Sequence, residues 1–155
     1  MLAIIVAVLV VAADQLTKWL VMTRMTEFAE IPVIQGFFSL QFVYNPGAAF
    51  GMLGGARWFF VAVALLAVGA MLWFLRHPEG KEGLVPLALG LLMGGSVGNL
   101  IDRIRFGEVV DFFLFYWRDY SFPNFNVADI AITLGVGLFI LHLMLTGEKQ
   151  RREGI

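Results

Sequence analysis

Four long apolar runs dominate the pattern of hydrophobic and polar positions along the chain. They cover about residues 2–22, 58–75, 84–104 and 127–146, and few charged residues interrupt them. At about 1.5 Å per residue, a helix over each run is long enough to cross a hydrocarbon layer of about 30 Å. The pattern therefore predicts four membrane-spanning helices, and an even number of spans puts both ends of the chain on one side.

Two connecting segments carry patterns of their own. Across residues 38–44 large apolar side chains recur at every second position, the period of a strand, and the Asn-Pro-Gly of residues 45–47 is typical of a turn. Residues 109–117 are almost all aromatic or aliphatic, as in segments that settle at the headgroup level. We expect an all-α membrane protein, a four-helix transmembrane bundle with a small β-sheet and loop cap, in one domain over residues 1–155.

The composition supports a membrane protein and excludes several functions. Hydrophobic residues make up 59% of the chain, charged residues only 15%, and the mean hydropathy is +0.81. The net charge of −1 argues against a nucleic-acid partner. There is no cysteine, and both histidines lie away from the aspartates, so we expect no metal site, thiol nucleophile or cofactor.

Charge alone leaves the orientation in the membrane open. Five Lys and Arg residues fall on the side of the termini and six on the side of the aspartates, so the positive-inside rule gives no direct answer. Several of the six stand next to acids and can belong to a site, so they say little about orientation. The basic cluster at residues 149–152 has no such role, and it favours cytoplasmic termini. The N-terminal run lacks a basic start and a small-residue cleavage site, so we interpret it as a retained first span.

All aspartates fall at one edge of the predicted bundle, because successive spans reverse direction. They are Asp14, Asp102, Asp111, Asp119 and Asp129. Asp111 is the hardest to explain structurally, since its neighbours are apolar and a carboxylate at that depth is costly unless it is paired or functional. Carboxylates gathered at a membrane edge predict a site.

Two pairs of polar residues can also be explained by simpler structural roles. Asp14 and Lys18 are spaced i, i+4 and fit a helix ion pair, with the lysine reaching up to the membrane surface. Asn126 and Asp129 fit a helix cap followed by an acid at the third helical position. Either role is compatible with a nearby site.

The end of the third span carries both small and polar residues. The glycines at 94, 95 and 98 are suited to close approach of a neighbouring helix. Asn99, Asp102 and Arg103 lie within about one turn and could form a self-satisfied cluster.

Five motifs together resemble one protein family. They are DQLTK (residues 14–18), NPGAAFG (45–51), GGSVGNLIDR (94–103), VVDF (109–112) and FNVAD (125–129). In this order, with four spans and this length, they resemble the successive boxes of the bacterial lipoprotein signal peptidases, signal peptidase II. The resemblance covers the whole chain.

The resemblance implies an aspartic endopeptidase of the bacterial cytoplasmic (inner) membrane, with Asp111 and Asp129 as the catalytic pair. It implies cytoplasmic termini, an extracytoplasmic sheet and a site near the periplasmic face. Implied partners are diacylglyceryl-modified prolipoproteins, cut before the lipidated cysteine, membrane lipid, and globomycin-type cyclic peptides as inhibitors. The implied supporting and substrate-binding residues are Asp14, Lys18, Asn45, Gly98, Asn99, Asp102, Arg103, Asn126 and Ala128.

Two other function classes compete with the peptidase. A small proton-coupled transporter would also place carboxylates in a bundle, but it should line a path across the membrane, and the halves of the spans nearest the tail carry almost no polar side chains. A membrane scaffold without enzymatic activity needs no carboxylate cluster.

The carboxylates themselves suit peptide hydrolysis. Two close carboxylates sharing a proton can supply both the base and the acid that peptide hydrolysis requires.

Overall fold

The computed structural model describes the backbone of residues 1–47 and 54–153, and the side chains of residues 1–47 and 54–147. Residues 48–51 of the second motif and the basic side chains of the tail lie outside the described part.

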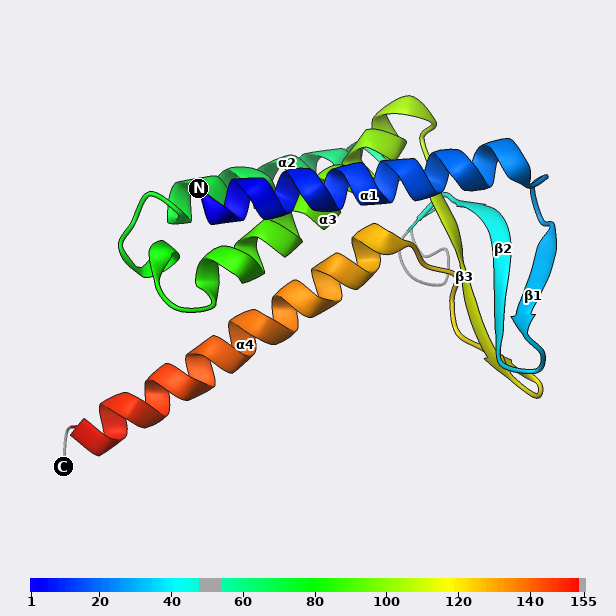
Figure 1. Cartoon of the computed structure of the whole chain (residues 1–155). Coiled ribbons are helices and arrows are strands. Elements are labelled where there is room, and N and C mark those ends of the chain that lie inside the picture. Colours follow the sequence, from blue (N-terminus) through cyan, green and yellow to red (C-terminus); the bar gives the residue numbers. More distant parts are fainter. Residues whose placement is uncertain (48–53, 154–155) are drawn as a thin grey trace.

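The apolar runs form four helices where the sequence predicts them (Figure 1). They are α1 (Leu2–Arg24), α2 (Arg57–Phe74), α3 (Val85–Arg105) and α4 (Val127–Glu153), with a short 3-10 turn η2 (Glu79–Lys81) before α3. Proline stands in the first turn of α3, where its missing N–H costs nothing. The fourth helix continues past its predicted span, because its polar end is rich in good helix formers although it is not apolar.

Helix α3 lies between the other helices and is the most deeply buried of them. Glycines on two of its faces allow this packing. A Cβ at Gly94 would lie 2.6 Å from the Cβ of Val10 in α1, and a Cβ at Gly95 would collide with the carbonyl oxygen of Ala128 in α4. Close helix approach at small residues is the usual packing in membranes, and the close approach expected at these glycines is confirmed.

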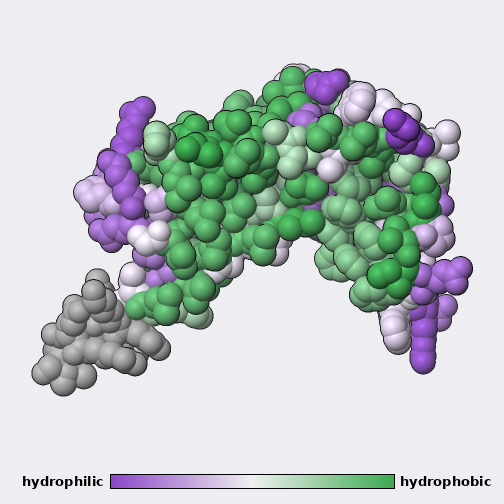
Figure 2. All heavy atoms as spheres, viewed as in Figure 1, coloured by the Kyte–Doolittle hydropathy of each residue, from purple (hydrophilic) through white to green (hydrophobic). Residues whose placement is uncertain are grey.

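The outer surface of the bundle is apolar, as a lipid-facing surface must be. Large hydrophobic side chains of α1, α2 and α4 are exposed, and hydrophilic side chains gather toward the two ends of the molecule (Figure 2). Both termini lie at one end and the sheet at the other (Figure 1).

The sheet is antiparallel, in the order β1-β2-β3-β4. Its strands are β1 (Glu30–Ile34), β2 (Phe38–Asn45), β3 (Val109–Trp117) and β4 (Tyr120–Ser121). The period-2 pattern predicted β2, whereas residues 109–117 were expected only as an interfacial segment. The first four residues of β3 are all buried, on both faces of the strand. Their side chains therefore do not alternate between apolar and polar, and the sequence shows no period of two.

A small apolar cluster fixes the sheet to the end of α1. It joins Val21 of α1 to Phe42 of β2 and to Val110 and Phe112 of β3, all of them buried. In the same register Val43 of β2 lies opposite Asp111. Packing against the bundle therefore holds Asp111 at the sheet end of the helices.

Candidate active site

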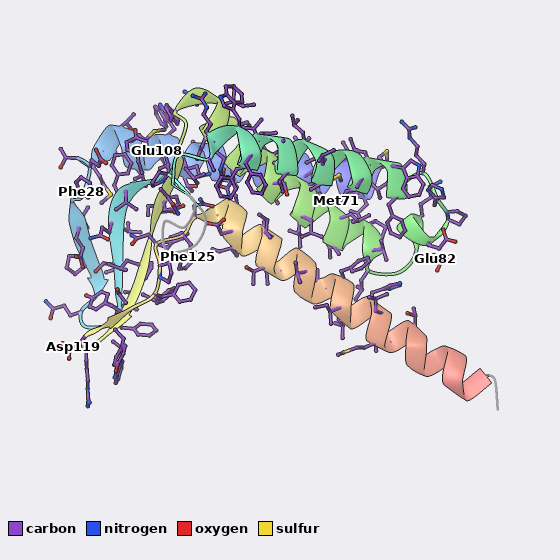
Figure 3. All side chains as sticks on the ribbon, turned by 180° about the vertical axis from the view of Figure 1, so that it is seen from behind. Phe28, Met71, Glu82, Glu108, Asp119 and Phe125 are labelled. Atoms are coloured by element: carbon purple, nitrogen blue, oxygen red, sulfur yellow. The ribbon has the colours of Figure 1, made fainter. Side chains whose placement is uncertain are left out.

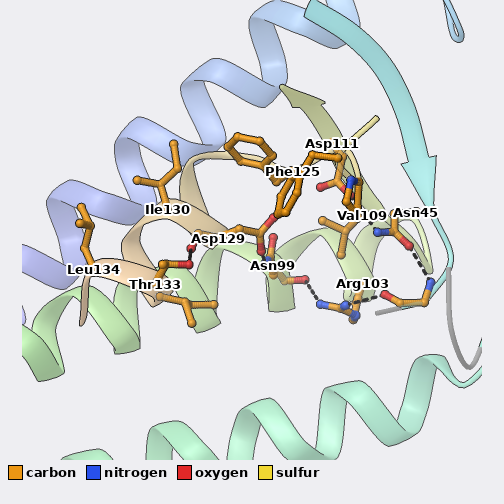
Figure 4. Close-up of a pocket in the computed structure, with 14 residues that line it drawn as sticks. Asn45, Asn99, Arg103, Val109, Asp111, Phe125, Asp129, Ile130, Thr133 and Leu134 are labelled. Atoms are coloured by element: carbon orange, nitrogen blue, oxygen red, sulfur yellow. Dashed lines mark hydrogen bonds between the residues drawn. The ribbon is translucent and has the colours of Figure 1, made fainter. Parts of the chain in front are cut away.

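Asp111 and Asp129 line the same cavity of about 550 Å³, although they come from different elements (Figure 4). Asp111 lies in β3 and Asp129 in the first turn of α4. The connection between them runs against β3, because the carbonyl oxygen of Phe125 accepts hydrogen bonds from the N–H groups of Phe112 and Phe113 at 3.0 and 2.9 Å. This short pairing brings the start of α4 beside the carboxylate of the strand.

A reciprocal cap holds Asp129. The side-chain oxygen of Asn126 accepts from the N–H of Asp129 at 3.0 Å, and Asp129 Oδ2 accepts from the N–H of Asn126 at 3.1 Å. This is a capping box with Asp in place of Glu, so the cap predicted from the sequence is confirmed.

Asn126 also reaches the other carboxylate. Its Nδ2 donates to Asp111 Oδ1 at 2.7 Å and to Asn99 Oδ1 at 3.1 Å, and the whole residue is buried. One side chain therefore fixes the position of Asp111 and, through the cap, that of Asp129.

Two further amides complete the contacts of the carboxylates. Asn45 Nδ2 donates to Asp111 Oδ2 at 2.9 Å, and Asn99 Nδ2 donates to Asp129 Oδ1 at 2.8 Å. Every oxygen of Asp111 and Asp129 thus accepts a hydrogen bond from an amide N–H. The amides have no proton to exchange near neutral pH, so they orient the two acids without competing for their proton.

Asp111 is poised to hold a proton near neutral pH. Its side chain is only 2% exposed. Burial, and after it the negative charge of Asp129, raises the pKa of Asp111 to about 7, while the hydrogen bonds from Asn45 and Asn126 act in the opposite direction. At Asp111 desolvation and the charge of Asp129 together outweigh the hydrogen bonds.

Lys18 is fully buried, which corrects the expectation that it reaches the membrane surface. Its Nζ lies 2.9 Å from Asp14 Oδ2, 2.8 Å from Asp102 Oδ2 and 2.9 Å from Asn99 Oδ1. The helix ion pair with Asp14 is confirmed, but it belongs to a network between α1 and α3. Because Asn99 Oδ1 accepts from Lys18, its amide nitrogen is directed to Asp129.

The other oxygen of Asp14 anchors α4. Asp14 Oδ1 accepts from the N–H of Ala128 at 3.0 Å. Gly98 leaves room for this carboxylate, since a Cβ there would lie 2.5 Å from Asp14 Oδ2 and 3.3 Å from the Cβ of Ala128. Three helices therefore meet where two of the predicted site residues are small.

The cluster of Asn99, Asp102 and Arg103 is not closed on α3, which corrects part of the sequence interpretation: Arg103 Nη1 donates to the carbonyl oxygen of Asn99 at 3.5 Å, but Asp102 and Arg103 also bind other elements. Asp102 Oδ2 accepts from the N–H of Val110 at 3.1 Å, next to Asp111 in β3. Arg103 donates to the carbonyl oxygen of Gly47 at 3.1 Å, and its guanidinium lies 4.8 Å from the ring centre of Phe60. Both side chains connect α3 to other elements because the helix ends beside β3 and the residue 45–47 turn.

One contributor was missed by the sequence analysis, and one aspartate stands apart. Gln15 Nε2 donates to Asp102 Oδ1 at 2.9 Å. The signals for Gln15 in the sequence were a polar side chain within an apolar run and its place in the DQLTK motif. Asp119 is exposed in the turn after β3, well away from the bundle (Figure 3). Among the described residues no group of three or more His, Cys, Asp or Glu side chains has the arrangement of a metal site.

Comparison with known proteins identifies the family. The sequence model of the family described as "Signal peptidase (SPase) II" matches residues 6–145. A lipoprotein signal peptidase of Symbiobacterium thermophilum is 64% identical over 96% of this chain and 98% of its own length, and that of Shouchella clausii is 44% identical over 98% and 99%. The chain belongs to the signal peptidase II family.

The fold comparison agrees with that assignment. Two solved structures described as bacterial membrane enzymes superpose on this chain. One has a TM-score of 0.88 at 36% identity, covering 96% of this chain and 90% of the other, and the second has a TM-score of 0.81 at 38% identity, covering 91% of each.

Membership in the signal peptidase II family resolves the function class. The chain is a protease that acts on prolipoproteins, and not a transporter or a scaffold. Four helices are long and apolar enough to cross a membrane, and in a signal peptidase II they indicate a bacterial inner-membrane protein.

Proposed function

We propose that Asp111 and Asp129 are the catalytic pair of an aspartic signal peptidase II, which cuts diacylglyceryl-modified prolipoproteins just before the lipidated cysteine. The observation that carries the proposal is a shared cavity into which two carboxylates project, linked through the buried Asn126. Paired carboxylates with different protonation supply the base and the acid of peptide hydrolysis.

The surroundings of the two acids assign their starting roles. Asp129 lies at the N-terminus of α4, where free N–H groups and the helix dipole favour a carboxylate. Asp111 has the raised pKa and begins protonated. Asp129 is the base that activates water, and Asp111 is the acid that polarises the scissile carbonyl.

The proton transfers then balance. Asp129 takes a proton from the attacking water, while Asp111 gives its proton to the carbonyl oxygen as the tetrahedral intermediate forms. The proton on Asp129 passes to the departing amine and Asp111 recovers its own as the C–N bond breaks. The products are a signal peptide with a new carboxyl end and a lipidated cysteine with a free amino group.

The remaining predicted residues position this pair and the substrate. Asn45, Asn99 and Asn126 hold the carboxylate oxygens, whereas Arg103 lines the cavity and meets the substrate backbone. The network that supports them from α1, α3 and α4 consists of Asp14, Lys18, Gly98, Asp102 and Ala128.

The cavity is suited to a substrate that arrives from the bilayer. Ile130, Ile132 and Leu134 of α4 line it, and Ile130 and Leu134 are also exposed on the outer face of the bundle. The diacylglyceryl chains and the signal peptide enter sideways over these residues from membrane lipid. Globomycin-type cyclic peptides would inhibit by occupying the same cavity.

The whole chain, residues 1–155, acts as one domain with cytoplasmic termini. The sheet then lies outside the cytoplasm, at the membrane surface. Exposed apolar side chains on β1, among them Ile31, Val33 and Ile34, support contact of the sheet with the headgroup region. The active site lies near the periplasmic face, where the sheet meets the bundle.

Purified protein in detergent tests the proposal with a diacylglyceryl-modified precursor and its unmodified twin. Wild type should cut only the lipidated precursor. Asp111→Asn and Asp129→Asn should each lower kcat by at least about a hundredfold, the scale of acid–base catalysis, because an amide keeps the shape but cannot exchange the proton. Asp119→Asn is the matched control and should retain activity, since Asp119 is exposed outside the cavity. Substantial cleavage by either dyad variant would contradict the assignment.

A further inference from the structure

A second cavity adjoins the first at Asp111. It has a volume of about 300 Å³, and both volumes lie in the range of about 300–1,000 Å³ usual for ligand cavities. The two cavities share Asn45, Asp111, Phe122 and Pro123 in their linings. Asp111 therefore stands where the two spaces meet, and a bound chain can extend from it in both directions.

The two linings differ in origin and polarity. The first cavity is lined mainly by apolar residues and includes a stretch of α4, from Asp129 to Leu134. The described residues that line the second belong to the sheet, to the turn after β2 at Pro46 and to the segment before α4, and Asn45, Ser121 and Asn124 are polar. Asn124 Nδ2 is committed to the backbone and side-chain oxygens of Gln41 at 3.2 and 3.1 Å, so its own carbonyl oxygen is the group it offers a ligand.

We infer that the second cavity is the subsite for the first residues of the mature polypeptide, those that follow the lipidated cysteine. The inference rests on the proposed function, because the scissile bond must lie at Asp111. The signal peptide and the acyl chains match the apolar cavity beside α4. The other half of the substrate then extends over the sheet, away from the helices.

The lining also defines the kind of chain that fits. Ser121 offers a neutral hydroxyl and Asn124 a carbonyl oxygen to an extended main chain, and among the described residues of the wall Asp111 alone is charged. The space suits a short stretch with small, uncharged side chains. A bulky side chain directly after the cysteine should be accommodated poorly.

The absence of cysteine from the chain allows a test in the folded protein. Ser121→Cys places a single thiol in the wall of the second cavity, and Tyr120→Cys places one on the neighbouring residue of β4, which lines neither cavity. Each variant is modified with methyl or benzyl methanethiosulfonate and later restored by dithiothreitol. Two lipidated precursors are compared, one ending at the cysteine amide and one continuing with Ser-Ser-Asn.

The benzyl adduct at position 121 should lower kcat/KM for the long precursor about tenfold more than for the short one. The methyl adduct should have a smaller effect, and reduction with dithiothreitol should restore kcat/KM. The adduct at position 120 should leave the ratio of the two precursors unchanged. An equal loss on both precursors, or no loss on either, would overturn the subsite. Failure of wild type to cut either precursor would instead overturn the proposed function.

A measurement on the wild-type protein keeps the inference testable if labelled Ser121→Cys is unstable. Replacing the first residue after the cysteine of the long precursor by Trp should lower kcat/KM below that of the Ser precursor by about tenfold. Equal rates for the Trp and Ser precursors would show that the cavity does not receive this residue.

Discussion

The contact between Gly98 and Asp14 gives the most demanding prediction. A Cβ at position 98 would lie 2.5 Å from Asp14 Oδ2 and 3.0 Å from its Cγ, against about 3.5–4.0 Å for optimal contact between carbon atoms. In Gly98→Ala the carboxylate must therefore move by about 1 Å. That movement stretches the hydrogen bond to Ala128, now 3.0 Å, and the ion pair with Lys18, now 2.9 Å.

The magnitude follows from three contributions. Overpacking costs about 1–3 kcal/mol, and a weakened hydrogen bond to a charged group costs up to about 1.5–3 kcal/mol. Replacing glycine by alanine in a helix interior returns about 0.5–1 kcal/mol. We expect a net loss of about 2–3 kcal/mol in unfolding free energy. Because Ala128 precedes Asp129, kcat should also fall, by about a hundredfold for a displacement of 1 Å.

Gly137→Ala is the matched control. Gly137 is a glycine of α4 with nothing within 4 Å of a built Cβ, so the substitution should be neutral or stabilise by up to about 1 kcal/mol. Unfolding of both variants in mixed micelles, followed by tryptophan fluorescence, and kcat on the lipidated precursor provide the measurements. If Gly98→Ala matches Gly137→Ala in both, the packing argument is refuted.

Two further predictions concern the protons and the buried charges of the site. Activity should fall as pH rises through about 7, because Asp111 then loses the proton it must donate. Asn45→Ala removes a hydrogen bond that lowers the pKa of Asp111, so the alkaline limb of the kcat/KM profile should move to higher pH. A shift of that limb to lower pH would contradict the reasoning. Lys18→Met leaves two buried carboxylates without their cation and should destabilise the protein by about 3–5 kcal/mol. Adding Asn at both carboxylates should recover part of that loss in the same unfolding assay, and no recovery would argue against the network.

Much of the fold could be predicted from the sequence because the deciding forces are local. Hydropathy over about twenty residues determines a membrane-spanning helix, and four helices formed where it indicated. In the strand at residues 38–44 large apolar side chains recur at every second position, so its period was visible in the sequence, although the buried residues Ser39 and Phe42 do not follow that period. The cap between Asn126 and Asp129 spans a single turn, and it too formed as predicted.

The structure brings the predicted site residues together, but the contacts between them were not predicted. Five motifs indicated the family and its residues, yet Lys18 was expected at the surface and lies buried. Its burial depends on α3 packing against α1, where Lys18 Nζ donates to Asn99 Oδ1, a residue 81 positions further along the chain. Likewise Asn99 was expected in a cluster within α3, whereas its amide connects Lys18 to Asp129.

The sequence by itself determined four spans, the strand at residues 38–44 and the residue types of the site, because each depends on neighbours along the chain. The tertiary structure decided that β3 pairs with β2, that Asn126 joins Asp111 to the cap of Asp129, and that a second cavity opens beside Asp111. Those features depend on how distant elements pack, and burial there sets the protonation of Asp111. A local sequence pattern does not determine these contacts, because they form only when the helices and the sheet pack together.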